Sequence, residues 1–218
     1  MAEIHPTKER RCRGRPQLRP DDATRAMIYE AARHEFADKG FAPTCMETVA
    51  RRAGISTKTL YRLIPNKVAL FEGMVSQRLD RASASINLHA ADHTDIEQAL
   101  VEALMACAEL TLGADVVALQ RMVMQERCTF SDIAATFYRT GVQRTQAALA
   151  DWLRTQQQRH LIALDDADEA AGMLLGMLVS APQRAALYGG LPLPSRQQIE
   201  QRVRSCAALF LRGCAIKA

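Results

Sequence analysis

The sequence has 218 residues, of which 48% are hydrophobic, so the chain is long enough to bury a sizeable core and to form one or two domains. The net charge of +4 is unevenly distributed: residues 1–67 contain 14 Lys and Arg against 8 Asp and Glu, whereas residues 68–218 contain 14 against 16. A basic first third predicts a polyanionic partner for that part, and it favours DNA over a membrane surface.

Several classes of protein are disfavoured by the sequence. No apolar run approaches 18 residues and the N-terminus is charged, so we expect neither a membrane span nor a secretory signal, and the cytoplasm is the expected location. The six cysteines form no CxxC pair, as is typical of reduced thiols. No GxSxG, HExxH, GxGxxG or P-loop spacing occurs, so we expect no enzymatic activity and no cofactor.

Residues 1–20 have the composition of a flexible basic arm, with six basic residues, two acidic residues and three prolines. Within this arm, Arg13-Gly14-Arg15-Pro16 has the form of an AT-hook core, in which Arg13 and Arg15 would enter a narrow A·T minor groove. The alternative is a solvated basic tail that adds only non-specific attraction to phosphates.

The next segment, from residue 21 to residue 39, is predicted to be a helix that braces the region after it. Its buried stripe would contain Ile28, Ala31, Ala32 and Phe36. Gly40 ends the helical pattern, and Phe41 is expected to join Phe36 in a small core.

Two short helical patterns, at about residues 46–53 and 57–63, surround a tight turn and predict a helix-turn-helix. Gly54 can adopt the left-handed conformation that the turn requires, and Ser56 or Thr57 is expected to cap the second helix. Leu60 points inward in this interpretation. The side chains left for DNA are Thr57, Lys58, Thr59, Tyr61 and Arg62, which suit phosphates and base edges in a major groove.

This region resembles the TetR family of bacterial transcription regulators, over about residues 24–74. The residues in the order and spacing of the family are Phe36, Gly40-Phe41, Thr44, Val49-Ala50, Ala53-Gly54-Ile55, Thr59-Leu60-Tyr61, Asn66-Lys67 and Leu70-Phe71. The resemblance implies that Thr57, Lys58, Thr59, Tyr61 and Leu63 face operator DNA and that Lys67 binds a phosphate, and Thr44 is predicted to belong to the same surface. Leu63, Ile64 and Cys45 depart from the pattern of the family, and an apolar Leu63 could contact only a thymine methyl group.

A longer amphipathic segment, from residue 67 to about residue 88, is predicted to connect this head to the rest of the chain. Arg78 and Arg81 are expected to be solvated there. His89 and His93 follow with a spacing that could chelate a metal, but no third ligand is near in sequence, and a polar helix end is the alternative that we prefer. We expect no metal site.

The remaining sequence predicts further helices at about residues 94–112, 116–127, 130–160, 166–188 and 195–214, so the fold class is all-α. Residues 125–138 and 210–213 also resemble the ligand domain of a subset of TetR regulators. In the last two helices, Gly172 and Gly176 would allow another helix to approach closely, which favours a homodimer interface, with an internal helix contact as the alternative.

We therefore expect a basic arm (1–20), a helix-turn-helix domain (21–66) and a ligand-binding and dimerisation domain (67–218) of a repressor that a small apolar ligand releases from its operator. A DNA-binding adaptor without a ligand is the alternative. The predicted lining of the ligand site, each member of which could instead be plain core, is Met105, Leu119, Met122, Phe137, Tyr138, Trp152, Met173 and Met177.

Overall fold

The computed structural model describes residues 20–89 and 95–214, and these residues form the all-α fold that the sequence predicts. The elements are α1 (Asp21–Lys39), α2 (Met46–Arg52), α3 (Thr57–Leu63), α4 (Lys67–His89), α5 (Ile96–Leu112), α6 (Ala114–Glu126), α7 (Ser131–Phe137), the π-helix η1 (Tyr138–Gln143), α8 (Arg144–Gln158), α9 (Ala167–Tyr188) and α10 (Arg196–Cys214). Residues 1–19 lie outside the described part of the chain, and so do the predicted groove contacts of Arg13 and Arg15.

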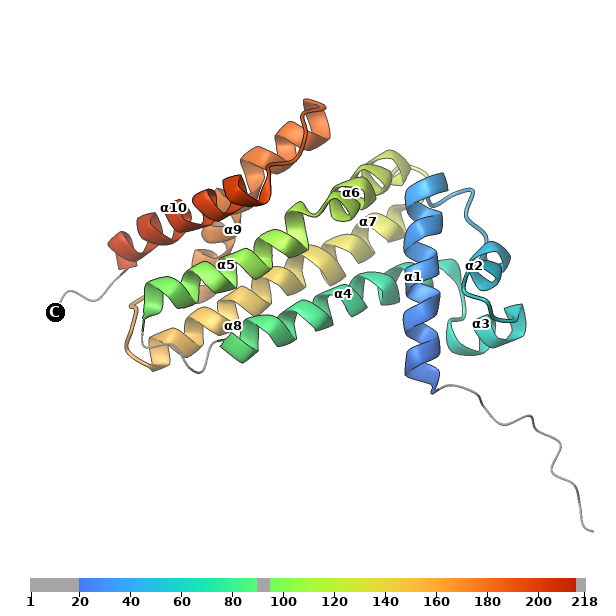
Figure 1. The fold of residues 1–218 in the computed structure, drawn as a ribbon, viewed down its shortest axis with the longest axis horizontal. Coiled ribbons are helices and arrows are strands. Elements are labelled where there is room, and N and C mark those ends of the chain that lie inside the picture. Colours follow the sequence, from blue (N-terminus) through green and yellow to red (C-terminus); the bar gives the residue numbers. More distant parts are fainter. Residues whose placement is uncertain (1–19, 90–94, 215–218) are drawn as a thin grey trace, which may run out of the picture.

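Helices α1 to α3 form a head at one end of the molecule (Figure 1). Gly40 and Gly54 end the first two helices with φ values of 84° and 67°, the left-handed region in which a glycine is unstrained. The Ser56 hydroxyl accepts a hydrogen bond from the Thr59 amide at 3.0 Å and so caps α3. The predicted helix-turn-helix is therefore present with its expected turn and cap.

Aromatic rings fill the core of the head. Phe36 and Phe41 stack at 5.5 Å between ring centroids, and Phe71 of α4 meets each of them edge-on at 6.0 Å. Phe130, just before α7, meets Phe41 at 5.3 Å. The core of the head is consequently continuous with α4 and with the start of α7, which stabilises its position on the other helices.

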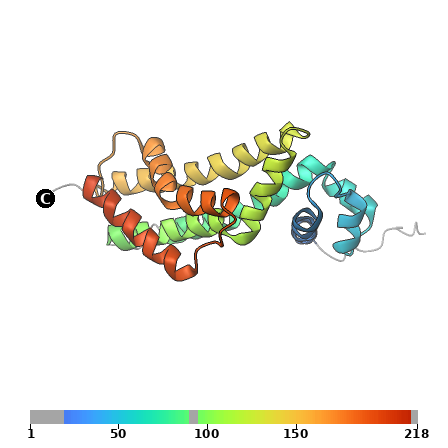
Figure 2. The same ribbon diagram turned by 90° about the horizontal axis from the view of Figure 1, so that it is seen from above.

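The body comprises α4 to α10. Helix α5 packs against α4, α9 and α10, and α8 packs mainly against α9. Figure 2 shows the head at one end of the long axis and α9 and α10 toward the other. Trp152 and Leu153 of α8 are buried with Leu100 and Leu104 of α5 in the core of the body.

The structure corrects the prediction of one uninterrupted helix over residues 130–160. The chain here is helical from Ser131 to Gln158, but a π-helical segment from Tyr138 to Gln143 separates α7 from α8. A π segment accommodates wider backbone hydrogen bonding than the 3.6-residue period assumes, so a hydrophobic pattern of that period does not reveal it. Gly141 and Val142 of this segment face the cavity described below.

Candidate functional site

The exposed face of α3 carries a group of polar side chains at the end of the molecule. Lys58, Tyr61 and Arg62 are exposed, and Thr57 and Thr59 are half-buried. The Tyr61 hydroxyl lies 3.5 Å from a carboxylate oxygen of Glu47 on α2. Burial, followed by the charge of Glu47, raises the pKa of Tyr61, so its phenol remains a protonated donor at neutral pH.

Arg62 is part of the same face but has a partner within the chain. Its two terminal nitrogens donate to the two carboxylate oxygens of Asp21 at 3.0 and 2.8 Å, in a bidentate pair between α3 and α1. The hydrogen bonds that Arg62 donates to Asp21 raise the pKa of Arg62, which is charged in any case. Both side chains are about half exposed, so the pair fixes the orientation of the guanidinium group more than it stabilises the fold.

Two residues predicted to contact DNA, Thr44 and Leu63, are buried, so the structure does not place their side chains on the exposed face of α3. Thr44 is 2% exposed, and its hydroxyl donates to the carbonyl groups of Gly40 and Glu35 at 2.7 and 3.2 Å. Leu63 is 6% exposed and belongs to the core of the head. Leu63 follows Leu60 by three residues, so the two side chains lie on the same, buried face of α3.

Lys67 at the start of α4 also differs from its prediction. Its ammonium group donates to the carbonyl oxygens of Phe41, Ala42 and Thr44 at 2.8, 3.0 and 2.9 Å, and lies 4.6 Å from the centre of the Phe41 ring. Burial lowers the pKa of Lys67, and the charge of Glu126 partly opposes this. All three N–H groups are used inside the protein, so in this structure Lys67 fastens the turn after α1 instead of offering its charge to a phosphate.

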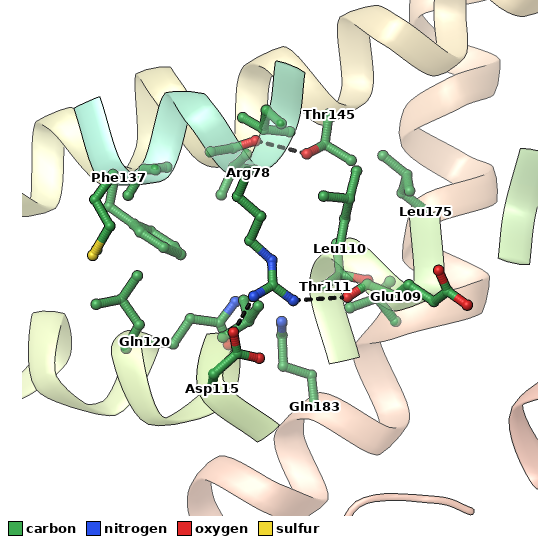
Figure 3. A pocket seen from close by; sticks show the side chains of 18 of the residues that line it. Arg78, Glu109, Leu110, Thr111, Asp115, Gln120, Phe137, Thr145, Leu175 and Gln183 are labelled. Atoms are coloured by element: carbon green, nitrogen blue, oxygen red, sulfur yellow. Dashed lines mark hydrogen bonds and ion pairs between the residues drawn. The ribbon is translucent and has the colours of Figure 1, made fainter. Parts of the chain in front are cut away.

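A cavity of about 660 Å³ lies where the head meets the body. Its walls come from α1, α4, α5, α6, α8 and α9 and from the segment around η1 (Figure 3). Most of the lining is apolar and includes Leu79, Leu110, Leu119, Phe137, Leu175 and Val179. The volume and the mainly apolar lining are those of a site for a small organic molecule.

Charged side chains from three helices meet at one wall of this cavity. Asp115 at the start of α6 accepts hydrogen bonds from Arg78 of α4 and, at 3.4 Å, from Arg33 of α1. Arg78 also donates to the carbonyl oxygen of Glu109 at 3.2 Å (Figure 3). Burial alone would raise the pKa of Asp115, but the two guanidinium groups outweigh it and hold the pKa below its ordinary value. The triad of Arg33, Asp115 and Arg78 therefore joins the head to two helices of the body.

Of the eight residues predicted to line a ligand site, Leu119 and Phe137 line the cavity. The other six lie elsewhere. Met122 and Trp152 are 6% and 2% exposed and belong to the packed cores, and Met105 lines a second, more polar hollow beside α10. Tyr138, Met173 and Met177 are exposed at the surface, at 57%, 59% and 37%.

Several lining residues were missed or misinterpreted from the sequence. Arg78, expected to be solvated, is half-buried in the cavity wall. Gly172 and Gly176 of α9, expected to admit a neighbouring helix, line the cavity. Gly176 borders open space, and a Cβ atom at Gly172 would lie 3.1 Å from the amide nitrogen of Gln146. Gln120 of α6 carried no signal in the sequence, because one glutamine on an amphipathic helix is normally solvated.

No group of three or more His, Cys, Asp and Glu side chains is placed to hold a metal within the described part of the chain. His93 lies outside that part, so the interpretation of the His89 and His93 pair stays a prediction. None of the described helices has the length and the apolar character needed to cross a membrane.

Comparison with known proteins gives two family matches that together cover most of the described chain. Residues 28–74 match the family described as bacterial regulatory proteins, tetR family. Residues 98–214 match the C-terminal domain of AefR-like transcriptional repressors. The second match alone spans more than half of the chain.

Individual relatives agree with these matches. The HTH-type transcriptional activator FasR of Mycolicibacterium smegmatis is 28% identical over 113 residues, which are 49% of this chain and 52% of FasR, so the chain spans about half the length of that relative. A TetR-family transcriptional regulator from Mesorhizobium loti has the same fold with a TM-score of 0.78, at 24% identity over 91% of this chain and 100% of that one. The flavonoid-responsive regulator FrrA has a TM-score of 0.67, at 24% identity over 90% and 100% of the two chains. The helix-turn-helix head, the helical body and these family matches show that the chain belongs to the TetR family of DNA-binding transcription regulators, a class of proteins that are not enzymes.

Proposed function

We propose that this protein is a homodimeric repressor that binds its operator through α3 and is released when a small, mainly apolar molecule enters the cavity. The observation that carries the proposal is the position of the cavity, which is lined by Tyr29, Arg33 and Ala37 of the head as well as by helices of the body. A molecule bound there contacts both parts at once. Its binding can therefore depend on how the head is oriented.

The exposed face of α3 supports the DNA-binding part of the proposal. Thr57, Lys58, Thr59 and Tyr61 project from a seven-residue helix, and the head of which it is part belongs to the more basic third of the chain. A helix of this kind enters a major groove with its polar face toward the base edges. We assign phosphate neutralisation to Lys58 and hydrogen bonding to Tyr61, and we expect Arg62 to reach DNA only by leaving Asp21.

Exposed apolar side chains on the last two helices support the homodimer. Met173, Met177 and Tyr188 of α9 and Leu209 of α10 are exposed at 59%, 37%, 70% and 63%. Large apolar side chains in such number on adjoining helices are typical of an interface. A two-fold dimer would bring two copies of α3 to successive turns of DNA, about 34 to 36 Å apart, as specific recognition by such small heads requires.

Release of DNA by a ligand is supported by the contacts that join head and body. Besides the triad of Arg33, Asp115 and Arg78, the carboxylate of Glu126 accepts from the amide of Ala42 at 3.2 Å, so both ends of α6 hold the head. Helix α6 also forms part of the cavity wall. A ligand that prefers a shifted α6 would change the spacing of the two heads. For a 100-fold loss of DNA affinity, the binding free energy of the ligand must differ by about 2.7 kcal/mol between the two arrangements of the head.

The alternative, a DNA-binding adaptor without a ligand, predicts a solid body, and a cavity of about 660 Å³ favours the sensor. FrrA, which shares the fold, is named for its response to a flavonoid, and that is consistent with a small organic ligand here. The C-terminal domain that residues 98–214 match is described as that of transcriptional repressors, which favours repression here, although the relative FasR is an activator.

The test begins with DNA fragments selected by the purified protein and with small molecules found by thermal-shift screening. Each bound molecule is titrated with and without the selected operator. Linkage requires the operator to weaken the binding of a releasing ligand by the same factor as the ligand weakens the binding of DNA. Equal ligand affinities in the two titrations would rule out release by this route. A reporter gene under the selected operator distinguishes repression from activation.

A further inference from the structure

A hydrogen-bond donor without a partner lies in the polar wall of the cavity. The amide oxygen of Gln120, on α6, is sealed within the wall, whereas its amide nitrogen is accessible and donates to none of the described residues. Gln120 lines the cavity, five residues after Asp115 on the same helix. The end of this side chain that a bound molecule can reach is therefore a donor.

Arg78 and Gln183 add further donors to the same part of the cavity (Figure 3). Each terminal nitrogen of Arg78 uses one N–H group, toward Asp115 and toward the carbonyl oxygen of Glu109, and the other N–H groups remain. The side chain of Gln183, on α9, points toward this guanidinium group and has no hydrogen-bond partner within the described part of the chain. An acceptor placed here would satisfy N–H groups from more than one helix.

The charges around these donors favour a neutral acceptor. The charged residues of the lining are two cations, Arg33 and Arg78, and three anions, Glu30, Glu109 and Asp115. Both arginines already donate to Asp115. An anionic ligand would have to displace this carboxylate from the guanidinium groups or remain close to its negative charge. A carbonyl oxygen can accept from the same N–H groups without bringing a further negative charge.

The rest of the lining suits a hydrocarbon body. Phe137, Leu175 and Val179 contribute apolar side chains. Gly176 borders open space, because no atom lies within 4 Å of the position that its Cβ atom would take. A molecule with one polar end and a larger apolar part therefore matches both kinds of wall.

We propose that the ligand is a neutral, largely apolar molecule with a carbonyl group, as in a ketone, an ester or an amide, and that Gln120 donates a hydrogen bond to the carbonyl oxygen. The inference rests on the proposed function, because it takes the cavity to be the sensing site. It adds the chemistry of recognition. Gln120 distinguishes a carbonyl group from a hydrocarbon of the same shape, and the charge of Asp115 disfavours a carboxylate.

The experiment uses three probes with one ring system: 2-acetylnaphthalene, 2-isopropenylnaphthalene and 2-naphthoate. The second has a methylene group in place of the carbonyl oxygen of the first, and the third is an anion. Dissociation constants are measured with the full-length protein by ligand-observed NMR. The carbonyl preference is the dissociation constant of 2-isopropenylnaphthalene divided by that of 2-acetylnaphthalene. Comparison of this ratio between two proteins cancels the different hydration of the probes.

Two variants assign the carbonyl preference to Gln120. Gln120→Met has a side chain of similar length without N–H donors, so the ratio should fall about tenfold, the effect of one hydrogen bond. Gln125→Met, the same change at an exposed position of α6, is the matched control and should keep the wild-type ratio. Thermal unfolding verifies that each fold is intact. A ratio that Gln120→Met retains, or that both variants lose equally, would overturn the assignment.

A measurement on the wild-type protein needs no variant. The carbonyl stretching band of bound, isotope-labelled 2-acetylnaphthalene is isolated by difference infrared spectroscopy. It should lie at a lower frequency than in hexane, because a hydrogen bond to the oxygen weakens the C=O bond. A band at the hexane position, tighter binding of 2-naphthoate than of 2-acetylnaphthalene, or no binding of 2-acetylnaphthalene would overturn the proposal.

The proposed function fails separately, when molecules that bind the cavity leave operator affinity unchanged. Molecules that release the operator from the cavity without any preference for a carbonyl group would leave the sensor intact and remove only the inference about Gln120.

Discussion

Arg33 of α1 and Asp115 of α6 form an ion pair of 3.4 Å that crosses from the head to the body, although the two residues are 82 positions apart in sequence. Arg78 shares the same carboxylate. Both residues line the cavity, so a bound molecule can contact this link between the head and the body directly.

Asp115→Asn should weaken the coupling between ligand and operator. The substitution retains the size of the side chain but leaves Arg78 without a carboxylate and Arg33 with Glu30 alone, and we expect a stability loss of about 1 kcal/mol. The factor by which a ligand lowers operator affinity should fall severalfold, measured by fluorescence anisotropy. Asp132→Asn, on the exposed surface of α7, is the matched control. A coupling factor that is the same in Asp115→Asn as in the wild-type protein would show that the triad does not transmit the signal.

The triad of Arg33, Asp115 and Arg78 also predicts that the free energy of unfolding depends on pH in the acidic range. The pKa of Asp115 in the folded protein lies below its ordinary value of 3.8, so the unfolded chain binds the proton more tightly than the folded chain. The stabilising contribution is therefore complete above pH values near 4 and is lost as the pH falls through the lower, folded pKa. Denaturant unfolding of wild-type protein and Asp115→Asn should give a difference in stability that narrows on acidification. A difference that widens would contradict the assignment.

Lys67→Met should destabilise the head without altering the salt dependence of operator binding. Methionine retains the stem of the side chain, but the carbonyl groups of Phe41, Ala42 and Thr44 lose their charged donor. We expect a loss of about 1 to 3 kcal/mol, or several degrees in the unfolding temperature. A slope of log affinity against log salt that falls by about one unit would instead place Lys67 on a phosphate.

Lys58→Met is the counterpart on the exposed face of α3. Its ammonium group is exposed, so thermal stability should not change. The salt slope should fall by about one unit, because one counterion fewer is released when the operator binds. The same two measurements thus assign opposite roles to two lysines nine residues apart, and an unchanged slope for Lys58→Met would remove it from the interface.

Tyr61→Phe should reduce operator affinity about fivefold, the effect of one hydrogen bond, with no change in salt slope. The phenol is 44% exposed and its nearest polar neighbour, Glu47, is 3.5 Å away, so it is available to DNA. Tyr138→Phe, at the exposed start of η1, serves as the control. Equal operator affinity of Tyr61→Phe and wild-type protein would limit Tyr61 to packing.

Gly176 allows the volume of the cavity to be changed from inside α9. Gly176→Ala should raise stability by about 0.5 to 1 kcal/mol, because alanine is favoured in a helix and its Cβ meets no atom within 4 Å. Gly176→Phe should fill part of the cavity and abolish ligand binding while operator binding persists. Ligand binding to Gly176→Phe with unchanged affinity would place the ligand elsewhere.

The head could be predicted from the sequence in most of its detail. Its helices follow from local signals such as Gly40, Gly54 and the cap at Ser56, and Phe36 and Phe41 form the expected core. Thr44 and Leu63, both predicted to contact DNA, are buried instead of lying on the exposed face. Thr44 lies in the turn between α1 and α2, where periodicity gives no direction, whereas the spacing of Leu63 from Leu60 already placed it on the inner face and the resemblance to the family outweighed that signal.

The cavity could be predicted much less well. Large apolar residues such as Trp152 and Met122 were assigned to it, but they fill the cores, because bulky side chains favour tight packing over the edge of a hollow. The actual lining depends on the absence of side chains at Gly172 and Gly176 and on polar residues that meet from distant helices. Neither feature produces a hydrophobic pattern.

Gly73, in α4, has a consequence for how such a regulator can change over evolutionary time. A Cβ atom at this position would overlap the hydroxyl and the ring of Tyr29. The Tyr29 side chain can therefore pack against α4 as it does only because residue 73 has no side chain. The ring of Tyr29 must therefore move before any other residue can occupy position 73, and Tyr29 is part of the cavity lining. Under the proposed function, a substitution at position 73 could reshape the sensing site, and so alter the response to a ligand, while the DNA-contacting face and the cavity lining kept their original residues.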